Sequence, residues 1–287
     1  MTLLECIEQQ SARLTQAGVS FGHGTSNAFD EAVWLALWKL GLPLDDLDSV
    51  AARELTAREG AAIDSLVEQR ITTRKPAAYL TGEAWLQGVP FTVDERTIVP
   101  RSLIAELIAD GTLDAWLADH TQLVLDLCTG NGSLAVLSAM AWPEVHVDAA
   151  DLSADALAVA RLNIERHDMG ERITLLQGDG LFAVADKRYD LILCNPPYVN
   201  SESMAALPAE YRAEPQLALA GGVDGMDFIR ALLDSAAQHM TDDAVLVLEI
   251  GHEAAHFEAA FATLEFAYLP THDTDDQVIL ITRQQLA

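Results

Sequence analysis

A short proline-rich motif near the middle of the chain has residue types suited to holding a planar amino group. It reads Asn195-Pro-Pro-Tyr198 and follows the apolar run 189–194. Two consecutive prolines fix φ and donate no backbone hydrogen bonds, so the loop is rigid. The Asn195 side-chain oxygen and the Pro196 carbonyl are then two acceptors held close together, with Tyr198 as a flat wall. Such a group fits a planar –NH2, whose two hydrogens meet two acceptors; outside a ligand site, the motif would indicate only a Pro-Pro turn with a buried tyrosine.

The end of an earlier apolar run carries glycines that could surround a ligand. The run 122–127 is followed by Gly130 and Gly132, and glycines let a backbone turn tightly and approach a ligand closely. Together with Ala135 they match G-x-G-x-x-A, which alone is a weak dinucleotide pattern. Asp126, near the end of the run, would place a negative charge beside the negative charge of a pyrophosphate, which disfavours a dinucleotide. It suits instead a ligand with an ammonium or sulfonium group.

Two further run ends carry acids suited to a nucleoside. Asp151 comes 21 residues after Gly130, about the spacing expected for a carboxylate that accepts ribose hydroxyls. The alternative is that Asp151 caps a helix beginning near Ser153. In Gly178-Asp179-Gly180 the carboxylate could accept an adenine amino group, although the tripeptide alone is an ordinary turn.

Alternating strands and helices are expected to bring these run ends together. From residue 122 onward, short β-like runs are separated by helical stretches such as 154–167 and 228–240. Continuous apolar strands alternating with helices predict an α/β fold, a parallel sheet covered on both faces, with its ligand at the carboxyl ends of the strands. The runs are 122–127, 145–150, 172–177, 189–194, 244–250 and 277–282.

The first 82 residues are predicted to form a small helical domain. Apolar residues recur there at helical spacing, and we interpret Trp34 and Trp38 as core residues. Thr56 and Glu59 form a capping-box pattern at the start of a third helix. Residues 83–99 mix apolar residues with turn residues, which predicts a strand or hairpin. The expected domains are therefore 1–82, a linking hairpin over 83–99, and 100–287.

Composition narrows the class of protein. The chain has 287 residues, with 17 basic and 44 acidic side chains, a formal net charge of −27. This charge repels nucleic-acid phosphates and attracts cationic partners, or it serves solubility alone. No apolar run is long enough to span a membrane, and three cysteines cannot make a disulfide framework. We expect a soluble, reduced, cytoplasmic protein without free DNA as substrate.

The four run ends together resemble a class I S-adenosylmethionine-dependent methyltransferase. The resemblance implies a Rossmann-like, mostly parallel seven-stranded sheet with the small helical domain N-terminal to it. Asn195-Pro-Pro-Tyr198 is similar to the signature of members that methylate exocyclic or amide nitrogens. The implied catalytic residues are Asn195, Pro196 and Tyr198. Substrate binding would use these three with Pro197 and Arg101, and no metal. The implied S-adenosylmethionine contacts are Asp126, Cys128, Thr129, Gly130, Asn131, Gly132, Asp151, Leu152, Asp179, Gly180 and Asn195.

Three further motifs resemble the protein glutamine methyltransferase (HemK-type) family over nearly the whole chain. They begin at Pro76, Val99 and Glu214, the last reading Glu214-Pro-Gln-Leu-Ala-Leu-Ala-Gly-Gly222. Gly22-His-Gly-Thr-Ser-Asn27 and Cys128 are similar to the branch (PrmB-type) that modifies a glutamine of large-subunit ribosomal protein L-three. The other branch modifies the Gly-Gly-Gln loop of peptide-chain release factors and stays open as an alternative. The implied partner is a basic ribosomal protein, without membrane or ribosomal RNA contact.

Other functions remain to be weighed. A nucleic-acid amino-methyltransferase would share the Asn-Pro-Pro-Tyr loop but would need a basic groove. An NAD-dependent oxidoreductase would explain the glycines but not that loop, and a binding module could keep the pocket without turnover. His252-Glu-Ala-Ala-His256 matches the H-E-x-x-H zinc pattern, for which a third ligand is not evident. Arg101 could anchor a loop over the substrate or pair with an acid such as Glu106.

Overall fold

The N-terminal part of the chain is a cluster of helices. A computed structural model of the protein describes residues 1–117, 121–184 and 186–286. The predicted capping box is confirmed, since Thr56 and Glu59 exchange side-chain and backbone hydrogen bonds. Apolar side chains of these helices form one buried cluster that includes Trp34, as expected, while Trp38 is only partly buried at its edge. The helices are α1 (Leu3–Gln16), α2 (Ala28–Leu40), α3 (Leu47–Val50), α4 (Ala57–Thr73) and α5 (Ala77–Thr81).

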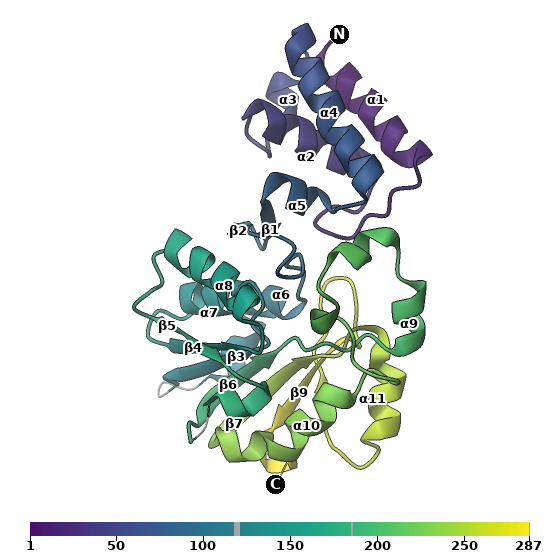
Figure 1. The fold of residues 1–287 in the computed structure, drawn as a ribbon. Helices are drawn as coiled ribbons and strands as arrows, with labels where there is room; N and C mark the ends of the chain where they lie inside the picture. The colour runs from purple at the N-terminus through teal and green to yellow at the C-terminus, as the bar shows by residue number, and fades with distance from the viewer. Residues whose placement is uncertain (118–120, 185, 287) are drawn as a thin grey trace.

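A two-stranded hairpin follows the helices directly. Strands β1 (Glu83–Leu86) and β2 (Val89–Thr92) pair antiparallel, with Gly88 in the left-handed region at the turn. In Figure 1 this hairpin lies between the helical cluster and the large sheet. Asn163 of the following domain donates to the Thr92 carbonyl and accepts from the Thr92 amide, which fixes the hairpin to that domain.

A seven-stranded sheet forms the centre of the rest of the chain, as the family resemblance implied. Its order is β5-β4-β3-β6-β7-β9-β8, and the first five strands in this order are parallel. β9 pairs antiparallel with β7, and β8 antiparallel with β9. The strands are β3 (Leu123–Leu127), β4 (His146–Asp151), β5 (Ile173–Gln177), β6 (Tyr189–Cys194), β7 (Met240–Glu249), β8 (Ala267–Tyr268) and β9 (Val278–Thr282).

Helices cover both faces of this sheet, so its strands are apolar on both sides. One buried cluster joins the sheet to α6, α7 and α8, and a second joins it to α10 and α11 (Figure 1). The helices are α6 (Ile104–Ala109), α7 (Ser133–Ala141), α8 (Ala154–Arg166), α9 (Ser201–Ala206), α10 (Asp227–Ala236) and α11 (Ala254–Ala260). Among the residues that the structure describes, no helix is both long and apolar enough to cross a membrane.

The structure differs from the sequence prediction at one helix–strand boundary and in one short strand. The helix expected over 228–240 ends at Ala236, and Met240 already belongs to β7, where it is fully buried and pairs with Tyr189. β8 has only two residues and was not predicted, because so short a strand carries no detectable alternation.

Candidate active site

The glycine loop after β3 is held from inside by a buried carboxylate. Asp126 Oδ2 accepts hydrogen bonds from Thr129 Oγ1 (2.5 Å) and from the Ala135 amide (2.9 Å). Burial raises the pKa of Asp126 to about 7 against these two bonds. Gly132 has φ +80°, and a Cβ there would lie 3.1 Å from the Cβ of Ala160, so the loop and α8 pack too closely for a side chain.

Asp151 ends β4 and links two turns of the site. It accepts from the Gly130 amide (2.9 Å) through one oxygen and from the Ser153 amide (2.8 Å) through the other. Burial outweighs these bonds and raises its pKa. The helix α8 is capped by the Ser153 side chain, which accepts from the Ala156 amide. Asp151 is therefore not the N-cap residue of α8, the alternative considered from the sequence.

A cavity of about 130 Å³ lies where these loops meet. Its walls combine two carboxylates, Asp151 and Asp179, with apolar side chains such as Leu152 and Phe228. This combination of side chains fits a nucleoside, because carboxylates accept hydrogen bonds from hydroxyl and amino groups and apolar walls cover a base. The cavity-lining residues among those expected for the cofactor are Cys128, Gly130, Asp151, Leu152, Asp179, Gly180 and Asn195.

The other expected cofactor residues lie behind this wall. Asp126 near the end of β3, and Thr129, Asn131 and Gly132 of the loop after it, do not line the cavity. The first three are buried, with side-chain or backbone hydrogen bonds inside the loop. Their position indicates that they shape the loop, and direct contact with a cofactor stays a prediction.

A second cavity of about 380 Å³ adjoins the first. It is lined by Arg101, Pro196 and Tyr198, while Pro197 lines the first cavity. The residues that line both cavities are Ile98, Asn195 and Ala218. The Asn195 side chain makes no hydrogen bond with the described part of the chain, so its amide is available at the junction.

Glu249 is a residue of the second cavity that the sequence analysis missed. Located at the end of β7, it accepts from Ser102 Oγ (2.6 Å), from the Leu103 amide (2.9 Å) and from Tyr198 Oη (3.1 Å). Burial raises the pKa of Glu249. The Tyr198 ring packs so tightly on Gly251 that a Cβ there would come within 2.4 Å of it. The sequence did carry a signal for Glu249, because it is an acid at the end of an apolar run, the same feature that singled out Asp126 and Asp151.

Arg101 pairs with Glu214 rather than with Glu106. Its guanidinium donates to both Glu214 oxygens, at 2.6 and 2.8 Å, and Glu214 also accepts from the Val99 amide. Burial acts to raise the pKa of Glu214, but His23 and Arg101 outweigh it and lower the pKa to about 2. Glu106 instead accepts from the backbone of a distant loop.

The segment that carries Glu214 also packs against the helical domain. His23 lies with its ring centroid 4.2 Å from that of Tyr211, and its Nε2 is 3.6 Å from Glu214 Oε2. The Arg101 guanidinium lies 5.4 Å from the centroid of the same tyrosine ring. His23 comes from the Gly22-His-Gly-Thr-Ser-Asn27 motif, which therefore reaches the wall of the second cavity.

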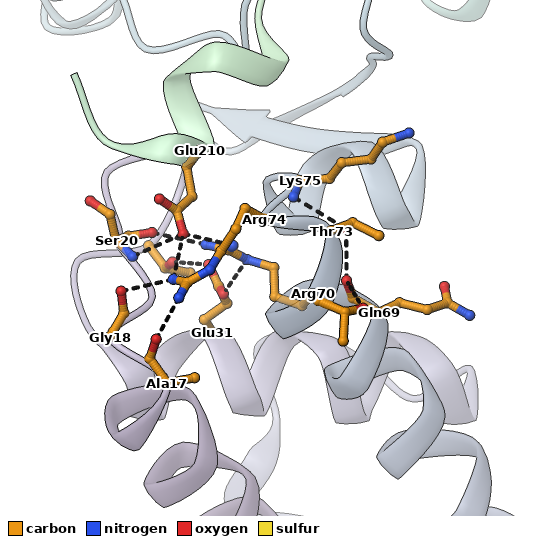
Figure 2. A network of polar contacts seen from close by, with 12 residues as sticks. Ala17, Gly18, Ser20, Glu31, Gln69, Arg70, Thr73, Arg74, Lys75 and Glu210 are labelled. Atoms are coloured by element: carbon orange, nitrogen blue, oxygen red, sulfur yellow. Dashed lines mark hydrogen bonds and ion pairs between the residues drawn. The ribbon is translucent and has the colours of Figure 1, made fainter. Parts of the chain in front are cut away.

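A buried arginine extends this contact (Figure 2). Arg70 of α4 is fully buried and donates to Glu31 Oε1 (2.8 Å), to Glu210 Oε1 (3.3 Å) and to the Ser20 carbonyl (2.8 Å). Arg74 donates to the same Glu210 oxygen. Glu210 thus joins the segment after β6 to residues of the helical domain through two arginines.

The zinc interpretation of His252-Glu-Ala-Ala-His256 finds no support in the fold. His252 and Glu253 lie in a 3₁₀ turn, and the helix α11 begins only at Ala254. Glu253 is engaged with Asn200 and His256. Within the described ranges, no group of three or more His, Cys, Asp or Glu side chains is placed to hold a metal ion.

Known proteins resemble this chain over nearly its whole length. The ribosomal protein uL3 glutamine methyltransferase of Bordetella pertussis is 51% identical, over 99% of this chain and 96% of the relative. This chain belongs to the ribosomal protein uL3 glutamine methyltransferase family. Members from Burkholderia pseudomallei and Neisseria gonorrhoeae are 50% and 46% identical, each over 99% of this chain and 95% of the relative. Residues 109–210 also match the methyltransferase small domain family.

Solved structures confirm the fold that this family name implies. The hMettl16 catalytic domain in complex with MAT2A 3'UTR hairpin 6 aligns with a TM-score of 0.52 at 12% identity, over 78% of this chain and 81% of that one. At this identity the likeness concerns the fold alone. The resemblance to class I methyltransferases is confirmed, and the oxidoreductase alternative is wrong. The protein is a uL3 glutamine methyltransferase family enzyme.

Proposed function

We propose that this chain methylates the side-chain amide nitrogen of a glutamine in ribosomal protein uL3, with S-adenosylmethionine as methyl donor. The observation that carries the proposal is the position of Asn195, whose side-chain amide lies at the junction of the cavity lined by Asp151 and Asp179 and a second, larger one. The names of relatives at 44–51% identity support the substrate. No contact favours the release-factor alternative, which becomes one arm of the test.

The first cavity is proposed to hold the cofactor. Asp151 would accept the ribose hydroxyls, and Asp179 and Gly180 would border the adenine. Cys128 and Gly130 would border the cofactor on the side of the loop that follows β3. Bound there, S-adenosylmethionine supplies an electrophilic methyl group on a sulfonium.

The second cavity is proposed to hold the glutamine side chain. An amide nitrogen is a poor nucleophile, because its lone pair is delocalised into the carbonyl. The Asn195 side-chain oxygen and the Pro196 carbonyl would accept its two N–H groups and direct the lone pair toward the first cavity. Tyr198, fixed by Glu249, would cover the amide plane and exclude water. Catalysis then relies on orientation and placed dipoles rather than on a strong base.

The remaining parts of the proposal concern partners and location. Residues 1–82 would recognise the protein substrate, and Arg101 would shape its cavity through Glu214. With a net charge of −27, the enzyme would meet a basic ribosomal protein in the cytoplasm, without binding a membrane, free DNA or ribosomal RNA.

Methyl transfer to purified substrates tests the proposal. The enzyme is incubated with methyl-labelled S-adenosylmethionine and, in separate tubes, unmethylated uL3 and unmethylated release factor, followed by peptide mass mapping. We expect label on one glutamine of uL3. Label on the release factor alone would show that the release factor, and not uL3, is the substrate. Label on neither protein would refute the proposed function.

A further inference from the structure

A large groove lies outside the two active-site cavities, between α2 and the β1–β2 hairpin. It has a volume of about 1050 Å³ and is open to solvent along one side of the molecule. Its walls come from α2, from the loop after it, and from the hairpin that precedes the catalytic domain. The residues that matter here are three tryptophans and three acids, Trp34, Trp38, Trp85, Asp30, Asp45 and Glu83.

The aromatic part of this groove is unusual for a surface. Three of the five tryptophans of the chain line it, and Trp85 is 45% exposed. Trp38 is half-buried at the groove wall. The Trp34 indole N–H is buried and has no hydrogen-bond partner among the described residues. Exposed indole faces attract ammonium and guanidinium groups through their negative π-face.

The acids give the groove a charge. Asp45 is exposed and makes no ion pair within the described chain. The Asp30 carboxylate accepts a hydrogen bond from the neutral Asn27 side chain, whose oxygen in turn accepts from the Asp30 amide. Glu83 is partly neutralised, because Arg166 pairs with it.

Two carboxylates without a cationic partner in the described chain therefore line the same groove as the exposed Trp85 ring. Lys39 of the chain itself lies 5.9 Å from the centroid of the Trp38 ring, so the cation that Trp85 and the two acids would attract comes from a partner. This arrangement suits lysine and arginine side chains and repels phosphates.

We propose that this groove binds a Lys/Arg-rich extended segment of the protein substrate, next to the segment that carries the target glutamine. The inference rests on the proposed function, since a basic ribosomal protein supplies the cationic segment. Charge complementarity identifies the occupant: a chain of net charge −27 presents these free acids, and its partner is a basic polypeptide.

The groove is within reach of the active site. Gly88 lines the groove and Ile98 lines both cavities, and ten residues of one continuous linker separate them. A chain of ten residues spans at most roughly 35 Å. An extended substrate segment of about this length can therefore occupy the groove while its glutamine lies beside Asn195.

Substrate length provides the test. Methylation kinetics are measured for full-length uL3 and for a short peptide limited to a few residues around the mapped glutamine. We expect Trp85→Ala and Asp45→Lys each to raise the KM for full-length uL3 by about tenfold at nearly unchanged kcat. Turnover of the short peptide should not change. Trp116→Ala is the matched control, because Trp116 is equally exposed (44%) but does not line the groove.

The possible results distinguish failure of the groove proposal from failure of the proposed function. An unchanged KM for uL3 in both variants, or an equal rise with the short peptide, overturns the groove proposal. If Trp85→Ala lowers peptide turnover through misfolding, Asp45→Lys decides alone, since Asp45 is an exposed loop residue. Failure of the wild-type enzyme to label uL3 at all would instead reject the proposed function, so the two failures are distinguishable.

Discussion

Asn195 is the only polar residue among the three that line both cavities. The side chains of the other two residues, Ile98 and Ala218, can exclude water but cannot accept a hydrogen bond. The side-chain amide of Asn195 is also free of other partners in the described chain. In the proposed function, selection of a planar amino group at this junction therefore depends on one side chain and on the rigid Pro196 backbone beside it.

Replacing this side chain should separate binding from turnover. We expect Asn195→Ala to lower kcat by on the order of a hundredfold, comparable to the loss of one placed dipole in an active site. Cofactor affinity should stay nearly unchanged, because the walls around Asp151 and Phe228 remain. Single-turnover methyl transfer and calorimetric titration with S-adenosylmethionine measure the two quantities. Wild-type turnover in the variant would contradict the assigned role.

Glu214 should give the protein an acid-sensitive contact. Its pKa of about 2 in the folded protein lies below the ordinary value of 4.5. Its stabilising contribution is therefore fully present above about pH 4.5 and is lost as the pH falls toward 2. The difference between these two pKa values corresponds to about 3 kcal/mol of unfolding free energy. Glu214→Gln should be less stable at neutral pH, because Arg101 loses its partner, and should lose less additional stability between pH 4.5 and 2.

Chemical denaturation at several pH values measures this difference. The expected result is convergence of the unfolding free energies of Glu214→Gln and wild type as the pH approaches 2. Parallel curves over the whole acid range would show that the Arg101–Glu214 pair does not contribute in this way.

Site residues close in sequence could be predicted, whereas those joined only by the fold could not. Asn195, Pro196 and Tyr198 are contiguous, so their chemistry was readable from the motif. Glu249 and Ser102 are 147 positions apart. No local pattern indicates which distant acid will meet which hydroxyl. The same holds for Arg101, which pairs with an acid, one of the two open alternatives, but with the distant Glu214 instead of the nearby Glu106.

At the scale of elements, the segment 209–214 is a cavity wall that the helical domain holds in place. Tyr211 lines the second cavity, and Glu214 beyond it lies 3.6 Å from His23 of the first domain. Glu210, on the other side of Tyr211, accepts from Arg70 and Arg74 of the same domain (Figure 2). The helical domain thus contributes to the shape of the second cavity without lining it.

Loosening this segment should affect the substrate more than the cofactor. We expect Glu210→Gln to raise the KM for uL3 severalfold, because a buried ion pair with Arg70 is lost, while cofactor affinity stays constant. Faster proteolytic cleavage within 200–215 should accompany it. Glu202→Gln, an exposed residue of the nearby helix α9, is the matched control. Equal kinetics and equal cleavage in both variants would contradict the role of Glu210.

The main elements were predictable because their apolar patterns are long. Each of the six predicted β-like runs overlaps a strand of the sheet, and the helices α1, α2 and α4 lie where apolar residues recur at helical spacing. The short elements α3, α5 and β8 have two to five residues, fewer than the period of a pattern can reveal. Tertiary contacts, not local sequence, determine where they form.

At the scale of the whole molecule, the net charge of −27 should govern encounter with the substrate. Opposite charges raise association rates at low ionic strength, and salt screens them. We expect kcat/KM for uL3 to fall steeply between low and high salt, while kcat at saturation changes little. Stopped assays over a salt series measure this effect. A rate that does not depend on salt would show that the acidic surface serves solubility alone.

The bonds from Arg70 and His23 to the 209–214 segment limit how this enzyme can be recombined with its relatives. A chimera with its crossover between residues 82 and 83 would separate Arg70 from its partner Glu210. The graft would replace the residues on one side of this contact and leave those on the other side unchanged. A transplantable unit therefore consists of two stretches, residues 1–82 and 209–214, which engineers must exchange together although more than a hundred residues lie between them.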